Sequence, residues 1–336
     1  MRSVCTDRTW LLVVVAAAAV LAVTDGTAAR APMKVGLIVA PPGVSDPFLR
    51  GPYQGLRRAV RELGIDGRVL TYGLREGPGP AYASLARQGY DLIIGVGFLD
   101  ASALDRVARS FPRSRFVIVD ASVNDLAHRP RNVRGVVFNS EEAAYLAGYL
   151  AALIEQRRPG EDVVGTVGGV KIPSVDSFIA GFQAGARKGV RGIRTLNAYA
   201  GDFLNERRCA AVAREQIARR AGVIFAVAGG CGVGALRAAK AARVWGIGVD
   251  VDQSFLGRHI LTSVVKRLDV ATFTTIRAFQ RGQLRFGRDS SFRLRDQGVG
   301  LARISPDVPH EFLRGVERIR REIVAGKIRV PARLRD

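Results

Sequence analysis

The stretch MKVGLIVAPPGVSDPFLRGPYQGLRRAVRELGIDGRVLT, residues 33–71, decides the fold class. It opens with an apolar strand-like run at 35–40 and closes with a second run at 68–71. Between them, apolar residues recur at the three- and four-residue spacing of one helix face: Tyr53, Leu56, Ala59, Val60 and Leu63. Continuous apolar strands separated by helices are typical of parallel sheets covered on both faces. The stretch therefore predicts an α/β protein.

The same alternation continues along the chain. Further strand-like runs occur at 91–95, 116–120, 133–138, 163–167, 193–196, 222–226, 246–250 and 260–265. About ten strands are more than one doubly wound sheet usually carries in a chain of this length, so the pattern predicts two Rossmann-like lobes. We assign residues 33–138 plus 264–292 to an N-terminal lobe, and residues 139–263 plus 293–336 to a C-terminal lobe.

The first 29 residues have the pattern of a secretory signal peptide. Arg2 and Arg8 precede an uncharged run at 10–23, and small residues follow it. The run has about fourteen residues, fewer than the ~20 that span a bilayer as a helix. We therefore expect an exported, extracytoplasmic protein, with an uncleaved N-terminal anchor as the alternative. Cys5 lies before the run and no cysteine directly follows it, so we expect no lipid anchor.

The chain is strongly basic, with 51 Lys plus Arg against 30 Asp plus Glu and a net charge of +21. Such a charge is typical of proteins that bind nucleic acid or acidic membranes. Here, however, the arginines are scattered and no block of five or six like charges occurs. We interpret the charge as a property of composition and expect no nucleic-acid partner.

Two cysteines follow the predicted signal peptide, Cys209 and Cys231. In an oxidising compartment an isolated pair can form one disulfide. Two separate buried thiols are the alternative.

Motifs of catalysis are absent. No P-loop and no G-x-S-x-G motif occurs, and Pro41-Pro42-Gly43 follows the first strand in place of G-x-G-x-x-G. The three histidines have no partner at metal-ligand spacing. We expect neither an enzyme, nor a metal site, nor a cofactor.

In open α/β sheets, ligands bind outside the carboxyl ends of the strands. Asp120 and Asp250 each close a strand-like run, and Gly229-Gly230 follows another. Carboxylates there can accept hydroxyl donors from a sugar, and small residues let the backbone approach a ligand. Lys266 follows the last run and could reach the same cleft. The alternative for each aspartate is a cap or turn, and for the lysine a solvated loop.

Two aromatic residues lie near predicted strand ends of different lobes. Phe48 follows Ser45-Asp46-Pro47, which has the pattern of a helix start, and Phe203 follows Gly201-Asp202. Two rings on opposing lobes could hold a planar base between them. Ordinary packing is the alternative.

Several segments resemble the basic membrane protein family, the purine-nucleoside-receptor-like substrate-binding proteins of ABC importers. The segments are GTVGGVKIP at 165–173, AGFQAG at 180–185, GYDLIIG at 89–95, YLAG at 145–148 and GVDVDQ at 248–253. The match runs from about residue 33 to 266. It implies a type I periplasmic-binding-protein fold with three crossovers, whose lobes close on a ligand. It also implies a nucleoside-like ligand, an ABC permease as partner and a monomer.

The resemblance implies roles for the candidate residues. Phe48 and Phe203 correspond to the family's base-stacking pair. Asp120, Asp250 and Lys266 correspond to polar contacts, the last two at the ribose, and Gly229-Gly230 lies beside the ligand. An exported sensory module with the same site is the main rival, and a nucleoside-processing enzyme is a third class.

This sequence departs from the family at two positions. Ala40 stands where the family usually has Asp, and Leu49 stands where it usually has Asn. Both changes remove polar groups from the base side of the expected site. They leave the sugar side intact.

Overall fold

The computed structural model describes residues 31–334, which contain two six-stranded sheets. The first sheet has the order β11-β5-β4-β3-β1-β2, and the second has the order β12-β10-β9-β8-β6-β7. All neighbouring strands are parallel except β10 and β12, which are antiparallel. The prediction of two Rossmann-like α/β lobes is confirmed.

The strands of the first sheet are β1 (Lys34–Val39), β2 (Asp66–Thr71), β3 (Leu92–Val96), β4 (Phe116–Val119), β5 (Val133–Phe138) and β11 (Arg288–Phe292). Those of the second are β6 (Val163–Gly168), β7 (Arg194–Tyr199), β8 (Val223–Val227), β9 (Trp245–Asp250), β10 (Ile260–Lys266) and β12 (Val299–Leu301).

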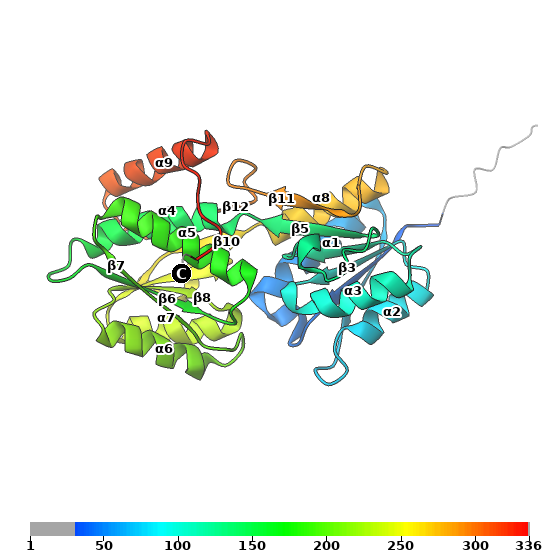
Figure 1. Ribbon diagram of the computed structural model, residues 1–336, viewed down its shortest axis with the longest axis horizontal. Coiled ribbons are helices and arrows are strands. Elements are labelled where there is room, and N and C mark those ends of the chain that lie inside the picture. The colour runs from blue at the N-terminus through cyan, green and yellow to red at the C-terminus, as the bar shows by residue number, and fades with distance from the viewer. Residues whose placement is uncertain (1–30, 335–336) are drawn as a thin grey trace, which may run out of the picture. The chain divides into compact units, whose positions relative to one another are not determined.

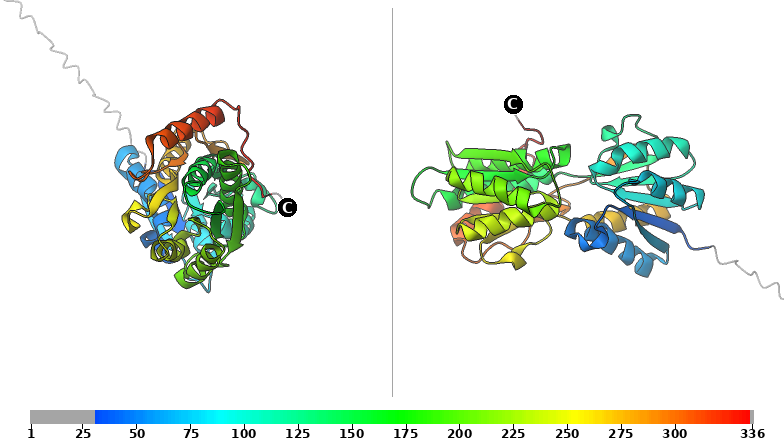
Figure 2. Two further views of the ribbon diagram at one scale, coloured as in Figure 1. Left: turned by 90° about the vertical axis from the view of Figure 1, so that its left-hand side faces the viewer. Right: turned by 90° about the horizontal axis from the view of Figure 1, so that it is seen from below.

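Helices cover both faces of each sheet (Figure 1). On the first sheet, α1 packs against α8, and α2 packs against α3. On the second sheet, α4 packs against α5 on one face, and α6 and α7 lie side by side on the other (Figure 2). The helices are α1 (Pro47–Leu63), α2 (Gly79–Arg87), α3 (Ala101–Ser110), α4 (Ser140–Glu155), α5 (Pro173–Gly189), α6 (Glu206–Ala218), α7 (Gly232–Ala241), α8 (Leu268–Gln280) and α9 (His310–Val324). Short 3-10 turns are η1 (Gly43–Ser45), η2 (Phe98–Asp100), η3 (Val123–Asp125), η4 (Gly229–Cys231) and η5 (Ser254–Leu256).

The contact between α4 and α5 depends on glycine. A Cβ atom on Gly148 of α4 would collide with the carbonyl oxygen of Phe182, and one on Gly185 of α5 with that of Tyr145. The two backbones therefore touch directly, which no larger residue permits. This contact fixes α4, which begins two residues after β5, against the second sheet.

The chain passes between the sheets after β5, after β10 and between β11 and β12. The predicted N-terminal lobe included residues 264–266, and this detail is wrong. These residues continue β10, because Val264 and Lys266 pair with Leu301 and Val299 of β12. The ladder with β12 keeps the strand in the second sheet to its last residue. The remaining lobe boundaries stay a prediction.

The predicted signal peptide, residues 1–29, lies outside the described residues. Within residues 31–334, none of the helices combines the length and the apolar character needed to cross a bilayer.

Candidate ligand-binding cleft

A cleft of about 270 Å³ lies at the carboxyl ends of strands from both sheets. This is near the lower end of the size range of small-molecule sites. Six of the predicted site residues line it: Phe48, Asp120, Phe203, Gly229, Asp250 and Lys266. Gly230 does not line it directly, although a Cβ atom there would lie 3.5 Å from the carbonyl oxygen of Phe203. Ala40 and Leu49, the two positions of departure, also line the cleft.

Lys266 is the centre of the charged part of the cleft. Its side chain is only 3% exposed, and its Nζ donates to both carboxylate oxygens of Asp120 at 2.9 and 2.8 Å. Its Nζ also lies 3.7 Å from Oδ1 of Asp250. Burial alone would lower the pKa of Lys266, but the two carboxylates outweigh burial and raise it. Lys266 is therefore charged, and its ion pair with Asp120 joins β10 of one sheet to the end of β4 in the other.

Three aromatic rings surround the Lys266 ammonium. Its Nζ lies 4.7 Å from the ring centroid of Phe178, 5.8 Å from that of Phe48 and 5.9 Å from that of Phe138. These are cation–π distances. The buried ammonium thus lies among three rings, and two of its three N–H groups donate to Asp120.

Asp250 has an unsatisfied acceptor in the cleft. Its Oδ1 is buried without a hydrogen-bond partner, and its side chain is 13% exposed. Burial is the main reason that the pKa of Asp250 rises to about 6; Lys266 opposes the rise, whereas Asp120 and Asp46 add to it. Buried polar atoms are normally paired, and an unpaired one costs free energy. A ligand hydroxyl that donates to Oδ1 would remove that cost.

Asp46 belongs to the cleft as well, which the sequence analysis missed by treating it only as a helix cap. Its Oδ1 accepts from the backbone N–H groups of Phe48 and Leu49 at 2.8 and 3.2 Å and so caps α1. Asp46 nevertheless lines the cleft and influences the pKa of Asp250. The cleft lining thus contains the carboxylates of Asp46, Asp120 and Asp250, and two of them contact the Lys266 ammonium, although the whole chain carries a net charge of +21.

A second polar cluster, also missed by the sequence analysis, lies at the end of β2 and in η2. The hydroxyls of Tyr72 and Tyr82 each donate to one oxygen of Asp100 at 2.8 Å. Burial raises the pKa of Asp100 to about 6, and the two hydrogen bonds oppose the rise. Tyr72 and Asp100 line the cleft, but both carboxylate oxygens of Asp100 already have protein partners. The fold brings Tyr72, Tyr82 and Asp100 together from separate segments, so their spacing in the sequence does not predict this cluster.

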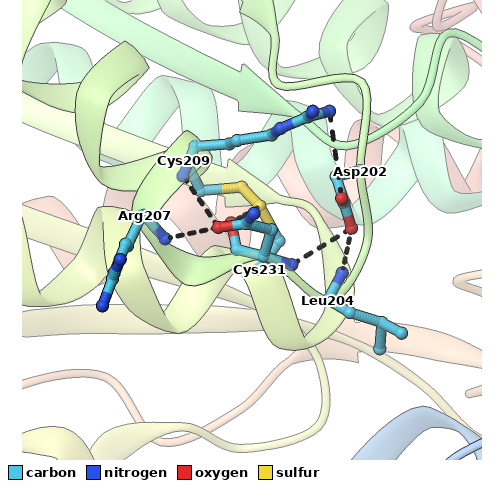
Figure 3. The surroundings of a disulfide bond; sticks show 7 residues. Asp202, Leu204, Arg207, Cys209 and Cys231 are labelled. Atoms are coloured by element: carbon cyan, nitrogen blue, oxygen red, sulfur yellow. Dashed lines mark hydrogen bonds and ion pairs between the residues drawn. A yellow bond between two sulfur atoms is a disulfide. The ribbon is translucent and has the colours of Figure 1, made fainter.

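Cys209 of α6 and Cys231 of η4 are joined by a disulfide, with their Cα atoms 5.6 Å apart (Figure 3). The backbone N–H of Cys231 donates to the carbonyl of Phe203 at 2.8 Å. The Asp202 carboxylate accepts from the backbone N–H of Leu204 at 2.7 Å. The disulfide therefore joins η4 to α6, and the hydrogen bond from Cys231 joins η4 to Phe203; Gly229 and Phe203 both line the cleft.

The described part of the chain contains no group of three or more His, Cys, Asp or Glu side chains arranged to hold a metal ion.

Substrate-binding proteins of ABC transporters share this two-lobed fold with a cleft at the strand ends. A solved solute-binding protein of an ABC transporter system from Aeropyrum pernix K1 matches with a TM-score of 0.76 and 27% identity, over 89% of this chain and 94% of that one. A counterpart from Conexibacter woesei DSM 14684 matches with a TM-score of 0.68 and 25% identity, over 89% and 99%. These neighbours have the type I periplasmic-binding-protein fold, as the resemblance implied.

The family follows from the sequence profile of ABC transporter substrate-binding proteins of the PnrA-like type, Bmp, which matches residues 34–333. The chain belongs to this family, and the predicted membership is confirmed. The "ABC transporter nucleoside-binding protein BmpA" of Lactococcus lactis is 28% identical over 324 residues, covering 90% of each chain. The "CD4+ T-cell-stimulating antigen" of Listeria monocytogenes is 30% identical over 320 residues, covering 88% of this chain and 87% of the relative.

Membership carries several consequences. The family consists of solute-binding proteins rather than enzymes. Substrate-binding proteins of ABC importers work outside the cytoplasm, take a small molecule as ligand and deliver it to a permease in the membrane.

Proposed function

We propose that this protein captures an unphosphorylated, nucleoside-like molecule in the cleft and delivers it to an ABC permease. The observation that carries the proposal is the buried Oδ1 of Asp250, which has no hydrogen-bond partner and lies 3.7 Å from the Lys266 ammonium, beside the Lys266–Asp120 ion pair. An acceptor next to a fixed donor suits vicinal hydroxyl groups, each of which can donate to one neighbour and accept from another.

The polar end of the cleft would hold a sugar. One ribose hydroxyl would donate to Asp250, and Lys266 would donate its remaining N–H to another. Hydrogen bonds to charged groups are worth roughly 1.5–3 kcal/mol each, more than those between neutral groups. The sugar would also satisfy the acceptor that is unpaired in the structure.

The planar part of the ligand would lie against aromatic side chains. Phe48 comes from the start of α1 and Phe203 from the loop after β7, so the cleft receives one ring from each lobe. Each stacked ring adds about 0.5–1.5 kcal/mol beyond burial. Micromolar binding corresponds to about −8 kcal/mol, and burial of the ligand's apolar surface in the cleft would add to these contacts.

The charge of the cleft argues against a nucleotide. Near its charged groups the cleft is lined by the carboxylates of Asp46, Asp120 and Asp250 and by one ammonium group, so a phosphate would meet excess negative charge in a partly buried place. The name of the Lactococcus lactis relative, a nucleoside-binding protein, supports the same ligand class.

Calorimetry tests the proposal. Adenosine, inosine and uridine are titrated into the protein, with adenosine 5′-monophosphate as the charged comparison. At least one nucleoside should bind, and the monophosphate should bind at least tenfold more weakly than adenosine. Asp250→Asn should weaken binding, whereas Asp307→Asn should not, because Asp307 pairs with exposed Arg258 away from the cleft. No heat with any nucleoside, together with no co-purified ligand in native mass spectra, would refute the proposal.

A further inference from the structure

The cleft is charged at one end and apolar at the other, and this change runs in the same direction along both sheets. Lys266 and Asp250 come from β10 and β9 of the second sheet, and Asp120 follows β4 of the first. From these strands each sheet continues toward an edge, through β3 and β1 to β2 and through β8 and β6 to β7. The charged groups therefore lie toward one end of the cleft, next to the strands where the chain crosses between the lobes.

The other end of the cleft is lined mainly by hydrocarbon. In the first lobe these residues follow β1, β2 and β3 or belong to α1, and in the second they follow β6, β7 and β8; among them are Ala40, Leu49, Leu74, Leu99, Phe203 and Leu204. Three strand spacings separate β4 from β2, which is ~14 Å. This length exceeds that of a sugar, so a sugar at the charged end would leave the apolar end to another part of the ligand.

Few polar side chains at the apolar end are free to hydrogen-bond a ligand. Both oxygens of Asp100 hold tyrosine hydroxyls, as described above. The other polar side chains there are Tyr72, whose hydroxyl donates to Asp100, Asp46, whose Oδ1 caps α1, and Ser174 in the first turn of α5. A purine such as guanine has several donors and acceptors on its edge, and each would lose its water without gaining a partner.

Three exposed leucines lie at this end. Leu74 is 77% exposed, Leu99 is 64% exposed and Leu204 is 51% exposed, and within residues 31–334 no other leucine is exposed. One exposed leucine needs no explanation, but these three come from separate loops and line a single cleft. Their exposure is typical of a surface that a ligand covers.

We infer that the ligand's ring system is apolar: a riboside of a benzenoid heterocycle whose outer substituents contact Leu74, Leu99 and Leu204. The inference rests on the proposed function, since it takes the sugar at the charged end as given. It adds that the ring is selected by hydrocarbon contact and not by hydrogen bonds to its edge.

Calorimetry with four ribosides tests the inference: 1-ribosylbenzimidazole, its 5,6-dimethyl derivative, inosine and guanosine. Ribosylbenzimidazole should bind at least tenfold more tightly than inosine or guanosine. Each methyl group should increase the affinity about fourfold, which corresponds to ~0.8 kcal/mol for a buried methylene-sized group. The dimethyl compound should therefore bind about 15-fold more tightly than the parent.

Variants locate the contact. Leu99→Asn should remove most of the gain from the methyl groups while changing the affinity for ribosylbenzimidazole less. Phe255→Asn is the matched control, because Phe255 is 72% exposed but does not line the cleft. Ala40→Asp should shift the preference toward guanosine, because it places an acceptor at the apolar end.

The outcomes separate the two proposals. If inosine or guanosine binds more tightly than ribosylbenzimidazole, the inference is wrong and the nucleoside-binding function stands. If Leu99→Asn weakens both benzimidazole ribosides equally, the leucine does not contact the substituents and the inference is also wrong. If none of the four ribosides binds, the proposed function itself fails.

Discussion

Asp120 and Asp250 close strands in opposite sheets with almost the same left-handed backbone, at φ 64° and φ 65°. This conformation is uncommon for residues other than glycine, and it is found at functional sites where the surrounding structure holds it. Both carboxylates face the Lys266 ammonium, one at 2.8 Å and the other at 3.7 Å. The closer carboxylate neutralises the lysine, and the more distant one retains a free acceptor. This difference in distance to Lys266 leads to opposite stability predictions for substitutions at Asp120 and Asp250.

Asp250→Asn should stabilise the ligand-free protein. The pKa of Asp250 is raised from 3.8 to about 6, so the folded state holds a proton that the unfolded state releases between these values. Stability therefore falls as the pH rises through this window, by up to about 3 kcal/mol for this one group. Denaturant titration at pH 8 should show a gain of about 1–3 kcal/mol that shrinks toward pH 4. A loss of stability at pH 8 would show that Asp250 pairs with Lys266 more strongly than its distance indicates.

Asp120→Asn should have the opposite effect. It removes the closest partner of a lysine whose side chain is 3% exposed, and breaking a buried ion pair typically costs 3–5 kcal/mol. Denaturant titration at pH 8 should therefore show a loss of that order. Asp120→Asn combined with Lys266→Met should recover part of it, because no unpaired charge remains. If the double variant is no more stable than Asp120→Asn alone, the loss does not come from the lysine.

Ligand affinity should fall as the pH drops below about 6. Protonation of Asp250 removes the carboxylate that accepts a ligand hydroxyl, so each pH unit below the pKa should weaken binding up to tenfold. Calorimetry with adenosine between pH 5 and 8 measures this dependence. Asp250→Asn should bind more weakly with a flatter pH profile. Affinity that rises toward pH 5 would show that the ligand prefers a protonated carboxyl group.

Removal of the disulfide should affect both stability and binding. The bond closes a loop with a sequence separation of 22 and is expected to contribute about 3 kcal/mol. Cys209→Ser combined with Cys231→Ser should lose that stability. Because this bond anchors η4, which contains the glycine loop and donates a hydrogen bond to Phe203, dissociation of adenosine should also become faster in stopped-flow measurements at a temperature where the variant is folded. Unchanged dissociation would mean that the hydrogen bond from Cys231 to Phe203 suffices.

The sequence allowed prediction of the main sheets, because their inner strands are continuous apolar runs separated by helical stripes. It did not reveal β11 and β12. β11 reads RDSSF and β12 has three residues, so both form only because β5 and β10 offer free edges. Asp120, Asp250 and Lys266 could be predicted as candidates because they lie at strand ends, which meet at one edge of a sheet.

Other parts of the cleft depend on contacts that spacing does not encode. Asp46 has the pattern of a helix cap, and nothing local shows that its helix starts at the cleft. The Tyr72–Asp100–Tyr82 cluster joins three segments whose distances depend on the complete fold. The disulfide remained one of two alternatives, because 22 residues of sequence give no Cα–Cα distance.

The most direct test of the account compares adenosine with 2′,3′-dideoxyadenosine by calorimetry at pH 7.5. The two compounds share the base and differ only in the hydroxyl groups that Asp250 and Lys266 are proposed to bind. Adenosine should bind, and the dideoxy compound should bind about a hundredfold more weakly or worse, since a site built for hydroxyls strongly rejects an analogue without them. Equal affinity for the two compounds would contradict it.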